Sequence, residues 1–185
     1  ALHEEGYPVA VLAPSGNHSA TGMRINLMKP MAYRSRDDLV ERWGLNPHTT
    51  PVHLFELDGT PCHAMIVALD GGLNHLVPGV HPQMVVSGVN LGPNLSQDSY
   101  HSGTMGAARE AGLYGVPAIA ASFTSFDPVG MERAVEATLD IVAAAAAVLP
   151  VKAGNLARPK GALETTYFTT WPKPSADEPW RDQPE

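Results

Sequence analysis

The sequence predicts an α/β fold: a Rossmann-like, doubly wound and mostly parallel sheet that lacks its first strand. Short apolar runs bounded by Gly or Pro alternate with segments of helical spacing, which is the pattern of strand–helix–strand units. Loops of small polar residues follow two of these strands. The first five residues resemble the last turn of a helix ended by Gly6, so we expect a strand and most of a helix to precede them.

The first half of the chain predicts two strands with a helix after the second. Residues 7–13 form a short apolar run before the polar loop 14–22, and Val52–Leu57 is a second run. Thr60 and Pro61 are suited to the N-cap and first position of a helix that extends to about residue 69. Between the strands we expect an extended segment at 23–33 and a short helix near 37–43.

The second half repeats the alternation. We expect strands at 83–87 and 116–123, a loop at 88–100, and a helix of small residues from about 101 to 114. Asp127 is the expected N-cap of a last helix that ends at Val148. Residues 1–150 therefore form one domain, and 151–185 form a Pro-rich, poorly structured tail with a weak strand at 166–170.

Composition excludes several classes of protein. The net charge is −7 and Lys and Arg do not cluster, so we expect no nucleic-acid scaffold function. The single cysteine, Cys62, fits a reducing cytoplasm. No apolar run approaches the ~20 residues that span a bilayer, and no signal peptide is visible, so we expect no membrane association.

The segment Ser87-Gly88-Val89-Asn90-Leu91-Gly92-Pro93-Asn94 is the strongest functional signal. It begins at a strand end, and ligands bind at the carboxyl ends of strands in open α/β sheets. An Asn oxygen coordinates hard cations, and an Asn NH₂ donates to phosphate oxygens, which makes Asn90 and Asn94 candidates. The competing interpretation is a Gly/Asn turn without a ligand.

Two weaker signals accompany it. Ser102, Gly103 and Thr104 begin a helix, where free N–H groups bind anions, although Ser102 is also a common N-cap residue type. Ser19 in the first loop offers a hydroxyl to a metal, although taken alone a solvated loop serine is the simpler interpretation.

The sequence lacks the motifs of several other classes of enzyme and binding site. The chain has no G-x-S-x-G, no G-x-x-x-x-G-K-[ST] and no G-x-G-x-x-G sequence. The eight histidines show no paired zinc spacing, and we expect Cys62 and His63 to be ordinary helix residues.

The motifs together resemble the SurE family of metal-dependent nucleotidases. The matching stretches cover roughly residues 1–150: Val11-Leu12-Ala13-Pro14, Ser19-Ala20-Thr21-Gly22, Gly59-Thr60-Pro61, Ser87 to Asn94, and His101-Ser102-Gly103-Thr104. The resemblance implies a 5'/3'-nucleotidase that removes phosphate from nucleoside monophosphates with a divalent cation, Mg²⁺ or Mn²⁺. It also implies a homo-oligomer for the intact family member.

The resemblance assigns roles residue by residue. Ser19 and Asn90 match metal ligands, and Asn94, Ser102, Gly103 and Thr104 match the phosphate site. The family's paired aspartates, in an N-terminal Asn-Asp-Asp-Gly motif, have no counterpart here, so the catalytic residues of this chain are unknown. The chain also departs from the family at Cys62-His63-Ala64, where the family's helix usually has an Asp followed by a Cys. We therefore expect impaired activity, with a non-catalytic nucleotide- or phosphate-binding module and a poorly folding gene product as alternatives.

Overall fold

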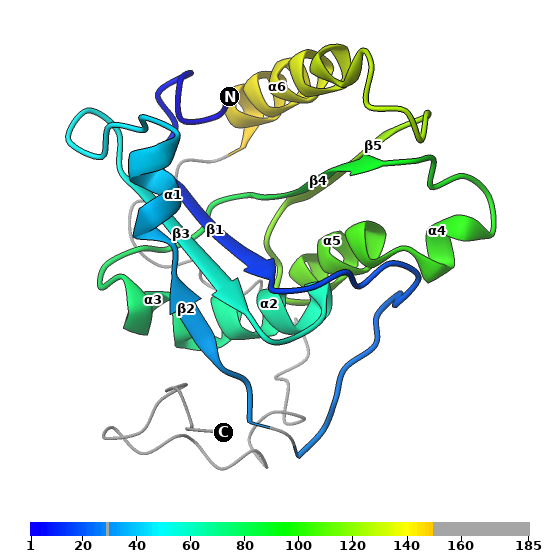
Figure 1. The fold of residues 1–185 in the computed structure, drawn as a ribbon, viewed down its shortest axis with the longest axis horizontal. Helices are drawn as coiled ribbons and strands as arrows, with labels where there is room; N and C mark the ends of the chain where they lie inside the picture. The colour runs from blue at the N-terminus through cyan, green and yellow to red at the C-terminus, as the bar shows by residue number, and fades with distance from the viewer. Residues whose placement is uncertain (29, 150–185) are drawn as a thin grey trace.

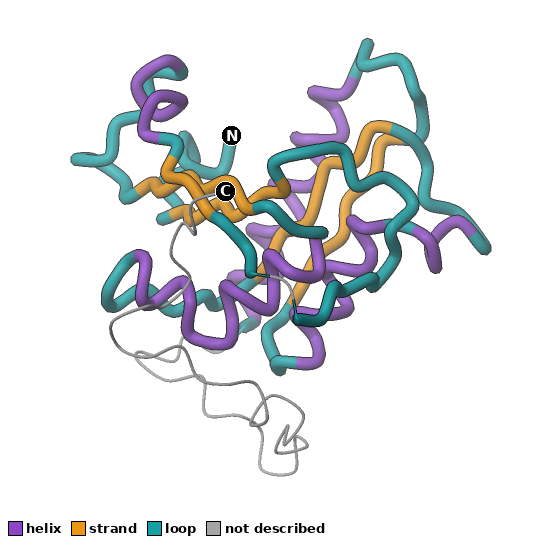
Figure 2. The backbone as a smooth tube through the Cα atoms, turned by 60° about the horizontal axis from the view of Figure 1, so that its bottom comes forward, coloured by secondary structure: helices purple, strands orange, loops and turns teal. Residues whose placement is uncertain are grey.

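The strands form two small sheets in the computed structural model, which describes residues 1–28 and 30–149. Figures 1 and 2 show the two groups of strands side by side. The sequence predicted one sheet; the described residues instead form a three-stranded mixed sheet and a two-stranded parallel sheet. The first has the order β1-β3-β2, namely Val9–Pro14, Val52–Leu57 and Tyr33–Ser35, and the second pairs β4 (Val85–Leu91) with β5 (Ala118–Phe123). β3 is parallel to β1 and antiparallel to β2.

Helices cover both faces of the strands, as in a doubly wound fold. β4 and β5 lie between α5 and α6, and α2 packs against both β1 and α5 (Figure 1). The helical segments are α1 (Asp37–Arg42), α2 (Pro61–Val67), a π-helical turn (Ala68–Gly72), α3 (Leu73–Leu76), α4 (Asp98–His101), α5 (Gly103–Leu113) and α6 (Met131–Val148).

The core is centred on β3. Val52, Leu54, Phe55 and Leu57 are buried because β1 and β2 flank this strand and α2 covers it. Such a nearly continuous buried run is typical of a central strand in a sheet that is covered on both faces.

β1 and β4 each have one edge that pairs with no strand among the described residues. No residue of β4 or β5 reaches full burial. Val11 of β1 and Leu91 of β4 are 39% and 43% exposed. The same helical layer, α2 beside α5, extends under both sheets. The interruption between β1 and β4 is therefore the reason that one predicted sheet appears as two.

Three predicted boundaries were wrong. Residues 23–28 and 30–32 are loop and turn rather than a strand, and only the short β2 follows them. β4 continues through Leu91 and α4 occupies 98–101, so the predicted loop 88–100 is much shorter. Asp127 does not cap α6, because its carboxylate accepts the Val129 N–H within the preceding turn and the helix begins after Gly130.

Several local predictions were confirmed. Residues 1–6 form a helical turn in which the Glu5 N–H donates to the Ala1 carbonyl, and Gly6 has a φ of +83°. Thr60 is the N-cap of α2, with Pro61 at its first position.

None of the helices in the described ranges is long and apolar enough to cross a membrane. The predicted strand at 166–170 lies outside these ranges.

Candidate phosphate-binding site

The loop after β1 packs against the first turn of α5. The Gly22 N–H donates to the His101 carbonyl at 2.7 Å, and the Thr21 hydroxyl donates to the His18 carbonyl at 2.8 Å. A Cβ at Gly103 would lie 3.1 Å from Thr21 Oγ1 and 3.4 Å from the His18 oxygen. Glycine at position 103 therefore lets the loop approach the beginning of the helix closely.

Ser102 is the N-cap of α5. Its side chain is buried, and Oγ accepts the Met105 N–H at 3.2 Å. Ser102 therefore caps the helix, as its residue type suggested. The first amides of a helix have no partner within the helix and are attractive to an anion. In α5 these amides belong to Gly103 and Thr104.

Asn90 at the end of β4 contacts the same turn. The Thr104 hydroxyl donates to Asn90 Oδ1 at 3.3 Å, and Asn90 Nδ2 donates to the Gly92 carbonyl at 2.9 Å. These two bonds orient the Asn90 amide so that its oxygen faces the start of α5. The side chain is half-buried, so its orientation is held by contacts on two sides.

Asn94 is fixed from the neighbouring strand. Its Nδ2 donates to Ser122 Oγ at 2.6 Å, and Ser122 pairs with Asn90 in the β4–β5 register. Sequence reasoning missed Ser122. The signal that could have found it is its position near the carboxyl end of a predicted strand, where site residues gather.

Ser19 is placed less tightly than the other candidates. It is exposed, and its N–H donates to Asn17 Oδ1 at 2.9 Å. Its neighbour His18 has the carbonyl that faces Gly103. The structure therefore brings Asn90 into direct contact with Thr104, adds Asn94 through Ser122, and places the Ser19 loop on the same helix turn.

Comparison with known proteins identifies the family. A sequence model described as "Survival protein SurE" matches residues 1–172, which is further than the motifs alone extend. The chain belongs to the SurE family. Two relatives named "5'-nucleotidase SurE" are similar: one from Desulfitobacterium hafniense is 36% identical over 135 residues, and one from Anaeromyxobacter sp. is 38% identical over 124 residues.

The SurE relatives are longer than this chain. The two alignments cover 73% and 67% of the chain but 47% and 42% of the relatives, so the chain spans about half of their length. A structure described as "Crystal Structure of Sure Protein from Aquifex aeolicus" is similar with a TM-score of 0.58 and 26% identity, over 76% of this chain and 50% of that one.

A buried Thr60–His63 pair anchors the SurE-like Gly-Thr-Pro turn. The Thr60 hydroxyl donates to the Arg24 carbonyl at 2.6 Å, and the Asn26 N–H donates to His63 Nε2 at 2.7 Å. The two residues also form a capping box: His63 Nδ1 accepts the Thr60 N–H at 2.9 Å, and Thr60 Oγ1 accepts the His63 N–H at 3.4 Å. Burial lowers the pKa of His63, because the charged imidazolium is disfavoured away from water.

Cys62 is a structural residue of α2. Its Sγ donates to the Gly22 carbonyl at 3.6 Å, and burial together with the nearby Glu110 raises the pKa of the thiol to about 11. A thiol of this kind is not a nucleophile at neutral pH, because the thiolate is the reactive form. Cys62 and His63 are therefore packing and positioning residues, as expected from the sequence.

The donor atoms at the site do not by themselves fit a divalent cation. Within residues 1–28 and 30–149, no three His, Cys, Asp or Glu side chains lie together in a way that could hold a metal. Ser19 and Asn90 offer only neutral oxygens. Such oxygens offset poorly the dehydration of a doubly charged ion, for which proteins normally supply carboxylates.

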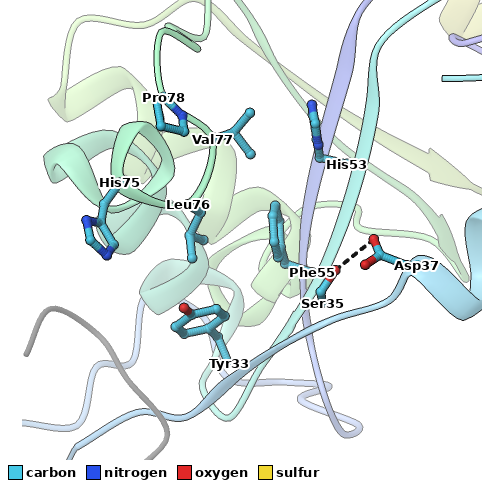
Figure 3. Close-up of a pocket in the computed structure, with 9 residues that line it drawn as sticks. All are labelled: Tyr33, Ser35, Asp37, His53, Phe55, His75, Leu76, Val77 and Pro78. Atoms are coloured by element: carbon cyan, nitrogen blue, oxygen red, sulfur yellow. Dashed lines mark hydrogen bonds between the residues drawn. The ribbon is translucent and has the colours of Figure 1, made fainter. Parts of the chain in front are cut away.

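A separate pocket of about 450 Å³ is lined by residues of β2, β3 and α3 and by the residues that follow α3. Figure 3 shows Leu76 beside the rings of Tyr33 and Phe55, with Val77 and Pro78 next along the chain. Its β3 residues, His53 and Phe55, precede the carboxyl end of the strand. None of the sequence-predicted site residues lines it.

Proposed function

We propose that the chain contributes the phosphate-binding part of a metal-dependent phosphomonoester hydrolase that acts on nucleoside monophosphates. The observation that supports this most directly is the contact between Asn90 and Thr104 at the first turn of α5. In a chain of the SurE family, whose relatives are named 5'-nucleotidases, this turn is the natural position for a phosphate group.

Each residue of the turn has a defined task in this proposal. The Gly103 and Thr104 amides donate to the phosphoryl oxygens and stabilise the charge that develops on them. Ser102 fixes the direction of these amides by capping the helix. Asn94, held by Ser122, supplies a further donor or acceptor at the edge of the phosphate.

In this proposal the intact protein binds a divalent cation, Mg²⁺ or Mn²⁺, that Asn90 and Ser19 would help to hold. The cation would supply Lewis-acid polarisation of the phosphoryl oxygens. None of the residues assigned to the site is a carboxylate, so Asn90 and Ser19 would need carboxylate partners from elsewhere in the intact protein. We therefore expect this chain alone to bind metal weakly and to release little or no phosphate.

A non-catalytic phosphate- or nucleotide-binding module is the second candidate. It is favoured by the same neutral donor set, since amides and hydroxyls suffice to bind a phosphate but not to hold the cation needed for turnover.

Calorimetric titration with adenosine monophosphate, with and without Mg²⁺ or Mn²⁺, tests the proposal when combined with an assay for released phosphate. We expect binding, and Asn90→Ala should weaken it roughly tenfold, since the oxygen that orients Thr104 at the phosphate-binding turn is lost. Asn74→Ala, on α3, is the matched control and should bind as the wild type does. Binding without release supports the module, and absence of binding contradicts both candidates.

A further inference from the structure

Phe126 is an aromatic side chain presented to solvent between β5 and α6. It is 78% exposed, which is unusual for so large an apolar group. The turn in which it lies has two local hydrogen bonds: Ser125 Oγ accepts the Asp127 N–H at 2.9 Å, and Asp127 Oδ1 accepts the Val129 N–H at 3.0 Å.

The ring lies directly against Gly92. A Cβ at position 92 would approach Phe126 Cε1 to 2.6 Å and Cδ1 to 3.0 Å, and Gly92 has a φ of +113°. Gly92 also donates its N–H to the Phe123 carbonyl and accepts the Asn90 amide. The ring therefore contacts the short segment that joins Asn90 to Asn94.

The segment that the ring contacts carries polar side chains, Asn90 and Asn94, at its two ends. Leu95, which follows it directly, is 64% exposed and adds apolar surface. A ligand that covers this surface needs a flat apolar face next to a polar, phosphate-bearing part.

We propose that Phe126 stacks against the base of the nucleotide whose phosphate binds at the first turn of α5. This inference rests on the proposed function and adds the residue that recognises the base. Aromatic side chains bind bases of any sequence through their π-faces, so the platform accepts both purine and pyrimidine nucleotides. Phe126 is a binding residue and takes no part in bond breaking.

The test compares adenosine monophosphate with ribose 5-phosphate, which has no base, by calorimetric titration of the full chain. Phe126→Ala should weaken binding of the nucleotide roughly tenfold, the scale of one lost base–aromatic stack, and leave binding of ribose 5-phosphate unchanged. Phe126→Tyr should retain the affinity, and Phe126→Leu should not. Val129→Ala, which removes an 80% exposed side chain from the same segment, should behave as the wild type.

The outcomes separate this inference from the function on which it rests. If ribose 5-phosphate binds but Phe126→Ala leaves nucleotide affinity intact, base stacking is wrong while the phosphate site stands. If Phe126→Ala weakens both ligands equally, the ring only supports the Asn90–Asn94 segment, which also overturns the inference. If the wild type binds neither ligand, the proposed function fails and the inference fails with it. A circular dichroism melt checks that each variant is folded.

Discussion

The Thr104 hydroxyl donates to Asn90 Oδ1 at 3.3 Å and thereby joins the first turn of α5 to the end of β4. The two residues are 14 positions apart and belong to different elements. Their contact fixes an amide oxygen beside the free N–H groups of a helix, an arrangement suited to a phosphate and its counter-ion.

Removing the Thr104 hydroxyl should cost modest stability. Thr104→Val keeps the shape of the side chain but leaves Asn90 Oδ1 without its donor, so we expect the free energy of unfolding to fall by about 1 kcal/mol. Urea denaturation measures the change. Thr104→Ser keeps the hydroxyl and is the control; an unfolding curve for Thr104→Val that overlays the wild type would show that the bond contributes nothing.

Two glycines of α5 should respond in opposite directions to the same substitution. A Cβ at Gly103 would lie 2.9 Å from Pro61 Cγ and 3.1 Å from Thr21 Oγ1, so Gly103→Ala should lower stability by about 1–3 kcal/mol. A Cβ at Gly112 meets nothing within 4 Å, so Gly112→Ala should raise stability by about 0.5–1 kcal/mol through helix propensity. Thermal unfolding of both variants measures the pair. Equal effects would mean that the loop after β1 does not press against α5.

His63 should make the protein less stable in mild acid. Its folded-state pKa lies below the ordinary value of 6.5, so the unfolded chain binds more protons as the pH falls past 6.5. The contribution of His63 is therefore full above pH 6.5 and is lost as the pH falls through the folded pKa. Urea denaturation over this range measures the loss, and His63→Gln should flatten it.

The pH dependence of the His63→Gln variant has to be compared with that of the wild type because the pKa of Glu110 is shifted as well. Burial raises the pKa of Glu110, which stabilises the fold as the pH falls and so opposes the effect of His63. His48→Gln, at an exposed position, should keep the wild-type pH dependence. A wild-type slope in His63→Gln would disprove the assignment to His63.

A strand added between β1 and β4 should join the two sheets. We expect an N-terminal extension made of a short apolar strand that ends in Asn-Asp-Asp-Gly to raise the melting temperature, because it would pair both unpaired edges and cover Val11 and Leu91. The same extension should restore phosphate release from a nucleoside monophosphate. An extension in which both aspartates are replaced by Asn is the control, which should gain the stability but not the activity. An unchanged melting temperature would contradict the single-sheet interpretation.

The sequence predicted the elements whose signals are local. Val52–Leu57 was found because a buried strand is a continuous apolar run, and the Thr60-Pro61 helix start because capping depends on neighbouring residues. The prediction that Asp127 caps the last helix was wrong, and it depended on the same kind of local signal. An Asp carboxylate can accept an N–H group from its own turn as well as from the start of a helix, and only the structure distinguishes the two.

The site was predicted less completely, because its contacts join distant positions. Asn94 was identified from its segment, but its partner Ser122 lies in another strand, 28 positions away. Phe126 gave no sequence signal, since its contact with Gly92 depends on how the segment after β5 folds back over β4. The division into two sheets depends on strand pairing, which apolar periodicity does not report.

The most direct test of the phosphate site is a nuclear magnetic resonance titration of the ¹⁵N-labelled chain with ribose 5-phosphate in the presence of Mg²⁺. We predict that the backbone amides of Gly103 and Thr104 and the side-chain amide of Asn90 show the largest shifts. If only the resonances of residues that line the pocket beside Tyr33 and Phe55 shift, and those of Gly103 and Thr104 do not, the account is contradicted.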